Sequence, residues 1–136
     1  MEVAIKAKAF GMKVVGINRS GQTETRDVLD YCRPISSLAE VLPDADYLVL
    51  SLPFTPETKG IIGEKELSLL TVGSFLINIA RGGIVDESAL YEALKSGHLA
   101  GAALDVWWRW GGYPCRYPIH QYNVLMTPHI SGATHE

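Results

Sequence analysis

Short apolar runs typical of buried strands alternate along this sequence with segments that favour helices. Five runs are predicted as strands, at residues 12–18, 46–52, 74–80, 100–106 and 123–127, with a brief extended piece at 31–34. The predicted helices lie at residues 3–10, 23–29, 37–42, 64–70 and 87–96. Asp86 can cap the start of the last helix, and Gly97 can end it. Because such alternation produces parallel strands joined by right-handed crossovers, the sequence predicts an α/β fold with a doubly wound parallel sheet.

The length and charge of the chain argue against several classes of partner. A chain of 136 residues is long enough for one domain with a hydrophobic core. Its 12 basic and 15 acidic residues give a net charge of -3 without a strong cluster of either sign, so neither nucleic acid nor an anionic membrane is an expected partner. No apolar stretch reaches the ~18 residues of a membrane helix. Cys32 and Cys115 lack the spacing of a disulfide framework, which predicts a reduced, cytoplasmic setting.

Charged side chains follow the predicted strands at the points where the strands end. Arg81 follows the strand at 74–80, Asp105 lies at the end of the next, and His129 follows the last. Each has a plain structural alternative, since Arg81 could form a surface ion pair, Asp105 could cap a turn and His129 could be a loop residue. Ligands of open α/β sheets bind beyond the carboxyl ends of the strands, so three such residues at three strand ends favour a binding or catalytic site.

The same segments resemble a known family. The chain is similar to the cofactor domain of the D-isomer-specific 2-hydroxyacid dehydrogenases in NIARGGIVDESALYEALKSGHLAGAALDV and NVLMTPHISGAT, and also in AFGMKVVG and LPFTPETKGIIG. The resemblance implies a Rossmann-like fold and a hydride transfer between NAD(P) and a small 2-hydroxy or 2-oxo acid, of the glyoxylate, hydroxypyruvate or phosphoglycerate type. It also implies a homodimer in the full-length parent.

The resemblance assigns roles to individual residues. Arg81 matches the arginine that grips the substrate carboxylate, a task that suits a planar two-point donor. His129 matches the acid/base that exchanges a proton with the oxygen at C2, and histidine as a residue type titrates near neutral pH. Asp105 matches the carboxylate that helps to hold the nicotinamide amide. The full set of implied cofactor-binding residues is Asn18, Arg19, Leu52, Pro53, Thr58, Ile79, Ala80, Arg81, Asp105, His129 and Gly132.

Three departures from the family pattern modify these expectations. The first strand and the loop G-x-G-x-x-G are missing, and so is the substrate domain, so residues 1–136 are expected to be a partial dinucleotide-binding domain that is inactive alone. Trp110 stands where the family places a glutamate that pairs with the histidine, and the aromatic run around it is interpreted as packing for its loop. Asn18 replaces the usual acidic residue at the adenosine ribose and Arg19 follows it, which favours NADP over NAD.

Two other functions are weighed against the dehydrogenase. A dinucleotide-sensing module, similar to corepressors that share this fold, would bind the cofactor without metabolic turnover, and Trp110 and the missing phosphate loop lend it support. A metal enzyme is not expected, because His129 and His135 are six residues apart with no nearby thiolate or clustered carboxylates.

Overall fold

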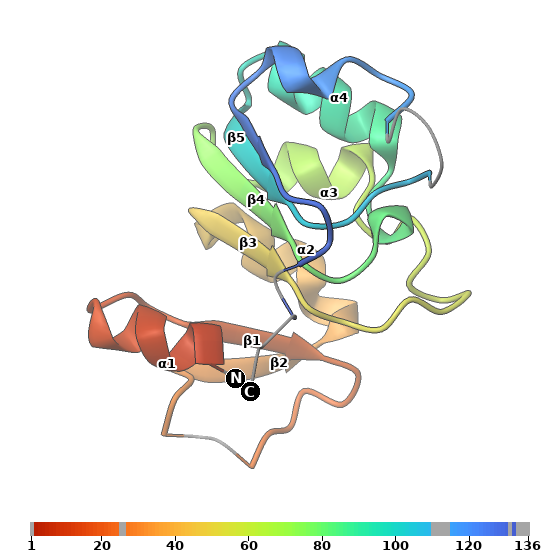
Figure 1. Cartoon of the computed structure of the whole chain (residues 1–136). Helices are drawn as coiled ribbons and strands as arrows, with labels where there is room; N and C mark the ends of the chain where they lie inside the picture. Colours follow the sequence, from red (N-terminus) through yellow and green to blue (C-terminus); the bar gives the residue numbers. More distant parts are fainter. Residues whose placement is uncertain (1, 25–26, 110–114, 131, 133–136) are drawn as a thin grey trace. The chain divides into compact units, whose positions relative to one another are not determined.

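The computed structural model describes residues 2–24, 27–109, 115–130 and 132, and the chain divides into two compact units (Figure 1). The first unit, residues 1–41, contains helix α1 (Glu2–Ala9), strands β1 (Val15–Asn18) and β2 (Tyr31–Pro34), the 3-10 turn η1 (Ile35–Ser37) and helix α2 (Leu38–Val41). Strands β1 and β2 pair in parallel, with Val15 opposite Tyr31, so the extended piece expected at residues 31–34 is a strand of a sheet. Asp30 supports this pairing, because its backbone N–H donates to Val14 O at 2.8 Å and its carboxylate accepts from Val14 N at 2.7 Å.

The prediction of a helix at residues 23–29 is wrong for the residues that the structure describes there. Residue 24 is a bend, residues 27 and 28 form a turn, and residues 23 and 29 have no regular secondary structure. Thr23, Asp27 and Val28 are all weak helix formers, and no amphipathic pattern compensates for them. A short segment with unfavourable propensities needs tertiary packing to become helical.

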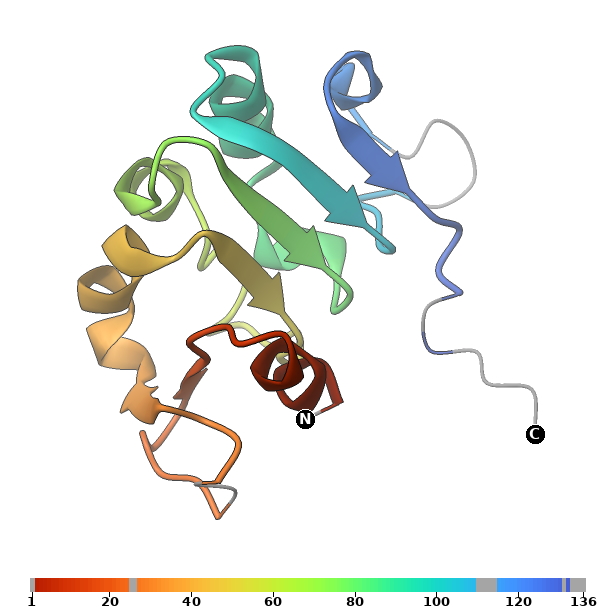
Figure 2. The same cartoon turned by 90° about the vertical axis from the view of Figure 1, so that its left-hand side faces the viewer.

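The second unit, residues 42–136, holds a four-stranded parallel sheet with a simple order. Its strands are β3 (Tyr47–Leu50), β4 (Ser74–Asn78), β5 (Leu99–Leu104) and β6 (Val124–Met126), in the order β3-β4-β5-β6. All three neighbouring pairs are parallel, and the four arrows point the same way in Figure 2. The α/β fold with parallel strands is therefore confirmed, and the described strands form two sheets.

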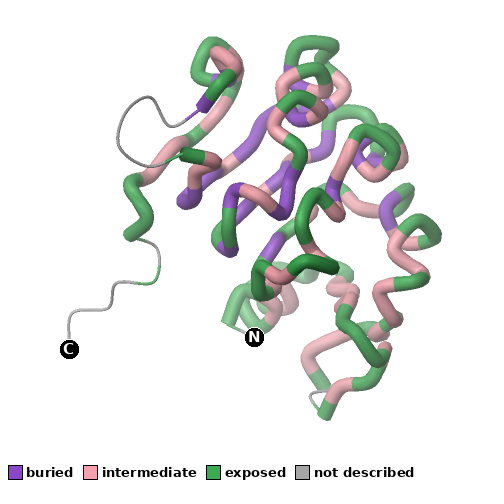
Figure 3. Tube along the Cα trace, turned by 90° about the vertical axis from the view of Figure 1, so that its right-hand side faces the viewer, coloured by how far each residue is buried: buried purple, intermediate pink, exposed green. Residues whose placement is uncertain are grey.

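Helices α3 (Glu64–Leu69) and α4 (Glu87–Lys95) cover one face of this sheet. Burial alternates along β4, where Leu76 is fully buried while Phe75 and Ile77 are half-buried. The largest fully buried apolar side chains are Leu42, Ile62, Leu67, Leu76, Ile84, Leu90, Leu104, Ile119, Val85 and Val106. Figure 3 colours the buried stretches of the chain purple. Within the described part of this unit, the opposite face carries exposed or half-buried apolar side chains from Tyr47, Val49, Phe75, Ile77, Ile79 and Leu125.

The second unit also contains three short 3-10 turns, and its helix α4 has a capping residue at each end. The turns are η2 (Leu42–Asp44), η3 (Gly82–Ile84) and η4 (Ile119–Gln121). Asp86 caps α4 as predicted, because its Oδ1 accepts a hydrogen bond from Ala89 N at 2.9 Å. Gly97 ends the helix with φ of 74°, a left-handed conformation that glycine adopts at little cost. In the described residues, no helix has both the length and the apolar composition of a membrane span.

Candidate active site

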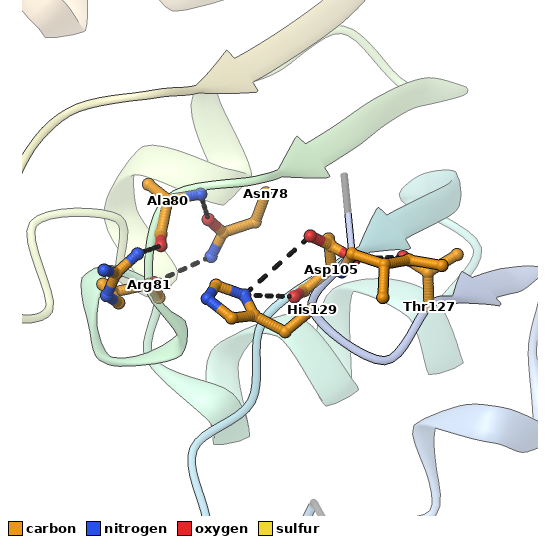
Figure 4. A network of polar contacts seen from close by, with 7 residues as sticks. Asn78, Ala80, Arg81, Asp105, Thr127 and His129 are labelled. Carbon is orange, nitrogen blue, oxygen red and sulfur yellow. Dashed lines mark hydrogen bonds and ion pairs between the residues drawn. The ribbon is translucent and has the colours of Figure 1, made fainter. Parts of the chain in front are cut away.

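The carboxyl ends of β3, β4, β5 and β6 are held in one row. The residue after each of β4, β5 and β6 donates a backbone hydrogen bond to the last residue of the neighbouring strand, from Ile79 N to Leu50 O (3.3 Å), from Asp105 N to Asn78 O (3.0 Å) and from Thr127 N to Leu104 O (3.0 Å). The chain leaves the sheet at the same level in each case. The residues that follow, Arg81, Asp105 and His129, therefore lie at one edge of the sheet, as predicted (Figure 4).

Asp105 is the most buried charged residue of this edge, with 4% of its surface exposed. Its Oδ1 accepts hydrogen bonds from the Thr127 hydroxyl at 2.6 Å and from Ile130 N at 2.9 Å. Its Oδ2 lies 3.8 Å from Nδ1 of His129. A buried carboxylate needs such donors, and here they also fix the chain that follows β6 against the end of β5.

The His129 ring contacts both the backbone carbonyl and the side-chain carboxylate of Asp105. Its Nδ1 lies 3.0 Å from the backbone carbonyl oxygen of Asp105, in addition to the contact with the Asp105 carboxylate. A carbonyl oxygen can only accept, so Nδ1 carries the hydrogen and the lone pair of the neutral ring is on Nε2. The His129 backbone has φ of 59°, which is uncommon for a residue with a side chain. The ring is therefore oriented and its tautomer is set before any ligand binds.

Arg81 is exposed and follows β4 in an extended conformation. Its Nη1 donates a hydrogen bond to Ala80 O at 2.6 Å. The turn beneath it is fastened by the side chain of Asn78, which accepts from Ala80 N and donates to Arg81 O, both at 3.0 Å. The guanidinium therefore lies at the surface, on a turn whose backbone is held by hydrogen bonds to the Asn78 side chain.

The segment after Arg81 packs directly on the loop that follows β5. A Cβ on Gly82 would collide with the backbone carbonyl of Trp107, so only glycine fits there. The indole N–H of Trp108 donates to Val85 O at 2.8 Å. The Trp108 side chain therefore packs its loop, in agreement with the interpretation of the tryptophan run, whereas Trp110 lies outside the described residues.

The loop between β3 and α3 is braced from within and tied to the arginine segment. The Thr58 hydroxyl donates to Pro53 O at 2.8 Å and accepts from Thr55 N at 2.8 Å. Gly60 N donates to Gly83 O at 2.8 Å, which joins the loop to the turn after Arg81. Leu52 is half-buried and Pro53 is exposed. In this structure the Thr58 side chain serves the shape of the loop.

A hollow of about 80 Å³ lies beside the strand ends on the open face of the sheet. Its walls come from Ile77, Ile79, Ala103, Leu104, Asp105, Leu125 and Thr127. Most of these residues are apolar, and Asp105 and Thr127 are the polar ones. This combination fits a flat ring that carries an amide, such as nicotinamide, because the ring contacts apolar surface while the amide N–H meets an acceptor.

Two of the other predicted residues belong to the first unit, and a third lies at the limit of the described chain. Asn18, in the first unit, accepts hydrogen bonds at Oδ1 from Ser20 N (3.0 Å) and Gly21 N (2.7 Å), and its Nδ2 donates to Gln22 O at 2.7 Å. It therefore shapes its own loop. Arg19 beside it is exposed, and so is Gly132. Among the described residues, no group of three histidine, cysteine, aspartate or glutamate side chains could hold a metal ion.

Sequence reasoning missed two residues of this edge, Asn78 and Thr127. Both lie at strand ends, and both bond to residues that were predicted. Asn78 could have been singled out from the sequence, because it is a polar residue inside the apolar run 74–80 and a buried polar side chain must find hydrogen-bond partners. The hydroxyl of Thr127 gave no comparable signal.

Comparison with known proteins agrees with this geometry. The family model described as D-isomer specific 2-hydroxyacid dehydrogenase, NAD binding domain, matches residues 1–131. The chain belongs to this family. The resemblance inferred from its motifs is therefore confirmed.

Similar proteins include enzymes of archaea and bacteria. A glyoxylate reductase of Thermococcus gammatolerans is 41% identical over 132 residues, which are 97% of this chain and 39% of the relative. A D-3-phosphoglycerate dehydrogenase of Methanocaldococcus jannaschii is 37% identical over 136 residues, 99% of this chain and 25% of the relative. The chain thus spans about two fifths or less of the length of these curated relatives.

Two solved structures are similar over nearly the whole chain. The crystal structure of phosphoglycerate dehydrogenase from Lactobacillus plantarum has a TM-score of 0.88 and 36% identity, covering 98% of this chain and 43% of that one. A D-isomer specific 2-hydroxyacid dehydrogenase from Xanthobacter autotrophicus Py2, solved with NADPH and MES, has a TM-score of 0.84 and 35% identity, covering 97% and 54%. The chain therefore has the NAD(P)-binding fold of this family.

Proposed function

We propose that residues 1–136 form part of the dinucleotide-binding domain of an oxidoreductase that transfers a hydride between NAD(P) and a small 2-hydroxy or 2-oxo acid. The substrate class is of the glyoxylate, hydroxypyruvate or phosphoglycerate type named for the relatives. A substrate-binding domain outside this sequence and a homodimer are parts of the same proposal. The observation that carries it is the meeting of a cation, a buried carboxylate and an oriented imidazole at one edge of the sheet.

Arg81 and His129 divide the work on the substrate. The planar guanidinium of Arg81 can donate two parallel hydrogen bonds to the carboxylate of a 2-oxo acid and so fix the position of its C2 carbonyl. His129, with its Nδ1 hydrogen directed to Asp105, exchanges a proton with the C2 oxygen at Nε2. Bound nicotinamide supplies or accepts the hydride.

The residues that would hold the cofactor fit it in chemistry. Asp105 offers an acceptor for the nicotinamide amide beside an apolar hollow that suits the ring. Ile79 and Ala80 offer backbone at the end of β4, and Leu52, Pro53 and the Thr58-braced loop offer backbone at the end of β3. Gly132 leaves room for close approach after β6, since a Cβ there would meet no heavy atom within 4 Å.

We further propose that the cofactor is NADP in preference to NAD. Asn18 brings no negative charge to the adenosine ribose, and it builds a loop from which the exposed Arg19 can pair with a 2′-phosphate. Similar structures include complexes with NADPH, among them an acyclic imino acid reductase that is 33% identical to this chain. Calorimetric titration of the protein with NADPH and NADH tests the preference.

One observation favours a second function, the dinucleotide-sensing module without turnover. Trp110 occupies the position of the glutamate that the family uses beside its histidine, and tryptophan has one donor and no charge. Tight dinucleotide binding without reduction of any 2-oxo acid in a broad screen would favour this module.

The decisive test is Arg81→Lys in the polypeptide as the cell makes it. Lysine keeps the charge but loses the planar fork, so kcat/KM for 2-oxo acid reduction should fall about ten- to a hundredfold, which corresponds to ~1.5–3 kcal/mol of transition-state binding. Cofactor affinity and melting temperature should change little. Arg116→Lys is the matched control, because Arg116 is an exposed arginine that precedes η4. If efficiency per folded molecule is unchanged in Arg81→Lys, Arg81 does not grip the substrate.

A further inference from the structure

We propose that Asn78 is the positioning residue of this site, which holds Arg81 and His129 in a fixed relation to each other. The inference rests on the proposed function, because it concerns the geometry in which a 2-oxo acid would be held. Asn78 is the last residue of β4 and has no exposed surface. It would touch neither substrate nor cofactor and would act through the residues that it binds.

Both polar atoms of the Asn78 side chain are used by the turn that carries Arg81. Oδ1 accepts from Ala80 N and Nδ2 donates to Arg81 O, each at 3.0 Å. Only a primary amide of this length can make both bonds at once, since aspartate lacks the donor and leucine lacks both groups. The Ile79–Ala80 and Arg81–Gly82 peptide units, which flank the Ala80–Arg81 peptide, are thus held in place by one buried side chain.

The orientation of Arg81 depends on this turn. The guanidinium Nη1 donates to Ala80 O at 2.6 Å, so the direction of that carbonyl sets where the guanidinium lies. The Ala80–Arg81 peptide lies between the two peptide units that Asn78 holds, so a large reorientation of this peptide would disturb the bonds to the buried Asn78 side chain. Leaving such groups unpaired costs roughly 1–3 kcal/mol each.

The backbone of Asn78 connects the same turn to the histidine. Asn78 O accepts from Asp105 N at 3.0 Å, and Asp105 O accepts from Nδ1 of His129 at 3.0 Å. A continuous series of hydrogen bonds therefore runs from Arg81 through Asn78 and Asp105 to His129. Figure 4 shows the bonds at its two ends, between Asn78 and Arg81 and between Asp105 and His129. This series sets the distance between the Arg81 guanidinium, which would hold the substrate carboxylate, and the His129 imidazole, which would exchange the proton.

The test uses Asn78→Asp, Asn78→Ala and a matched control in the polypeptide as the cell makes it. Asn78→Asp keeps the acceptor for Ala80 N but places an oxygen against Arg81 O, whereas Asn78→Ala removes both bonds. Ser74→Ala is the control, because Ser74 is buried on the same face of β4 and its hydroxyl has no partner among the described residues. We expect Ser74→Ala to leave melting temperature and kcat/KM unchanged.

Each Asn78 variant should lower kcat/KM for 2-oxo acid reduction at least tenfold, with a smaller effect on dinucleotide affinity. In an Arg81→Lys background the same substitutions should cost less than threefold, because the fork that Asn78 positions is already lost. Equal losses in both backgrounds would show that Asn78 does not act through Arg81 and would overturn the proposal.

A second measurement is independent of catalysis and needs no variant. In the parent protein, hydrogen exchange of the Asn78 side-chain amide should be at least tenfold slower than that of the exposed Asn18 and Asn123 amides, measured by NMR. Equal exchange rates would refute the positioning role even if the enzyme is active. Slow Asn78 exchange without any 2-oxo acid reduction would instead refute the proposed function and leave the geometry standing.

Discussion

Substitution of Gly82 by alanine tests whether the arginine segment is packed as tightly as the structure indicates. Gly82 is buried at the start of η3, directly after Arg81. An added Cβ would collide with the carbonyl group of Trp107 and lie 2.8 Å from Trp108 N. All of these neighbours are backbone atoms, so no side chain can turn away to make room.

The cost of this substitution can be estimated from the contact. Ordinary contacts of a Cβ begin near 3.4 Å, so η3 and the loop after β5 must separate by at least several tenths of an ångström. Overpacking of this kind costs about 1–3 kcal/mol. For a unit of about 100 residues each kcal/mol lowers the melting temperature by about 4–8 °C, so a decrease of roughly 4–24 °C is expected.

Calorimetry of Gly82→Ala beside the parent and Gly132→Ala measures the effect. Gly132 is the matched control because a Cβ there meets no heavy atom within 4 Å and its φ is not in the left-handed region. Activity of the folded Gly82→Ala protein should also fall, since Arg81 precedes the displaced turn. A melting temperature within about 1 °C of the parent would show that the two segments are not in contact and would refute the packing.

Two further predictions concern stability against pH and thiol reactivity. The hydrogen bonds from the Ser88 hydroxyl and from Ala89 N lower the pKa of Asp86, so its contribution to folding is present above the unfolded-state pKa and is lost as pH falls through the lower folded-state value. Asp86→Ala should therefore lower the free energy of unfolding by about 1 kcal/mol at pH 7 and by less at pH 2, measured by urea titration. Burial raises the pKa of the Cys115 thiol to about 11, so at pH 8 it should react with an alkylating agent far more slowly than the half-buried Cys32, and equal labelling rates by mass spectrometry would contradict this.

The parallel sheet could be predicted because its signals are local and strong. An apolar run such as 74–80 that is bounded by glycine has few alternatives to a buried strand, and Asp86 and Gly97 carry the chemistry of a helix start and stop. The segment at 23–29 lacks such signals, and there the prediction was wrong. The meeting of Arg81, Asp105 and His129 at one edge followed from the parallel order alone.

The bonds within the site could not be predicted, because they depend on register and on the paths of loops. The role of Asn78 requires that the chain turn back so that Ala80 N and Arg81 O both reach its side chain. The contact between Gly82 and Trp107 joins residues 25 positions apart, and nothing in either segment encodes the other. Thr58 was expected beside the cofactor from the resemblance, and its hydroxyl is used within its own loop.

The geometry around His129 indicates what is lost when Trp110 replaces the glutamate that the family places beside its histidine. An acidic partner of a catalytic histidine has two tasks, which are to fix the ring with a hydrogen on one nitrogen and to place a negative charge near it. The first task is performed by the Asp105 carbonyl at 3.0 Å, and the second by the Asp105 carboxylate at 3.8 Å from the same nitrogen. Neither depends on the residue at position 110. In the proposed function, a tryptophan there removes one source of negative charge but leaves the orientation of His129, and with it the direction of the proposed proton exchange at Nε2, set by the end of β5.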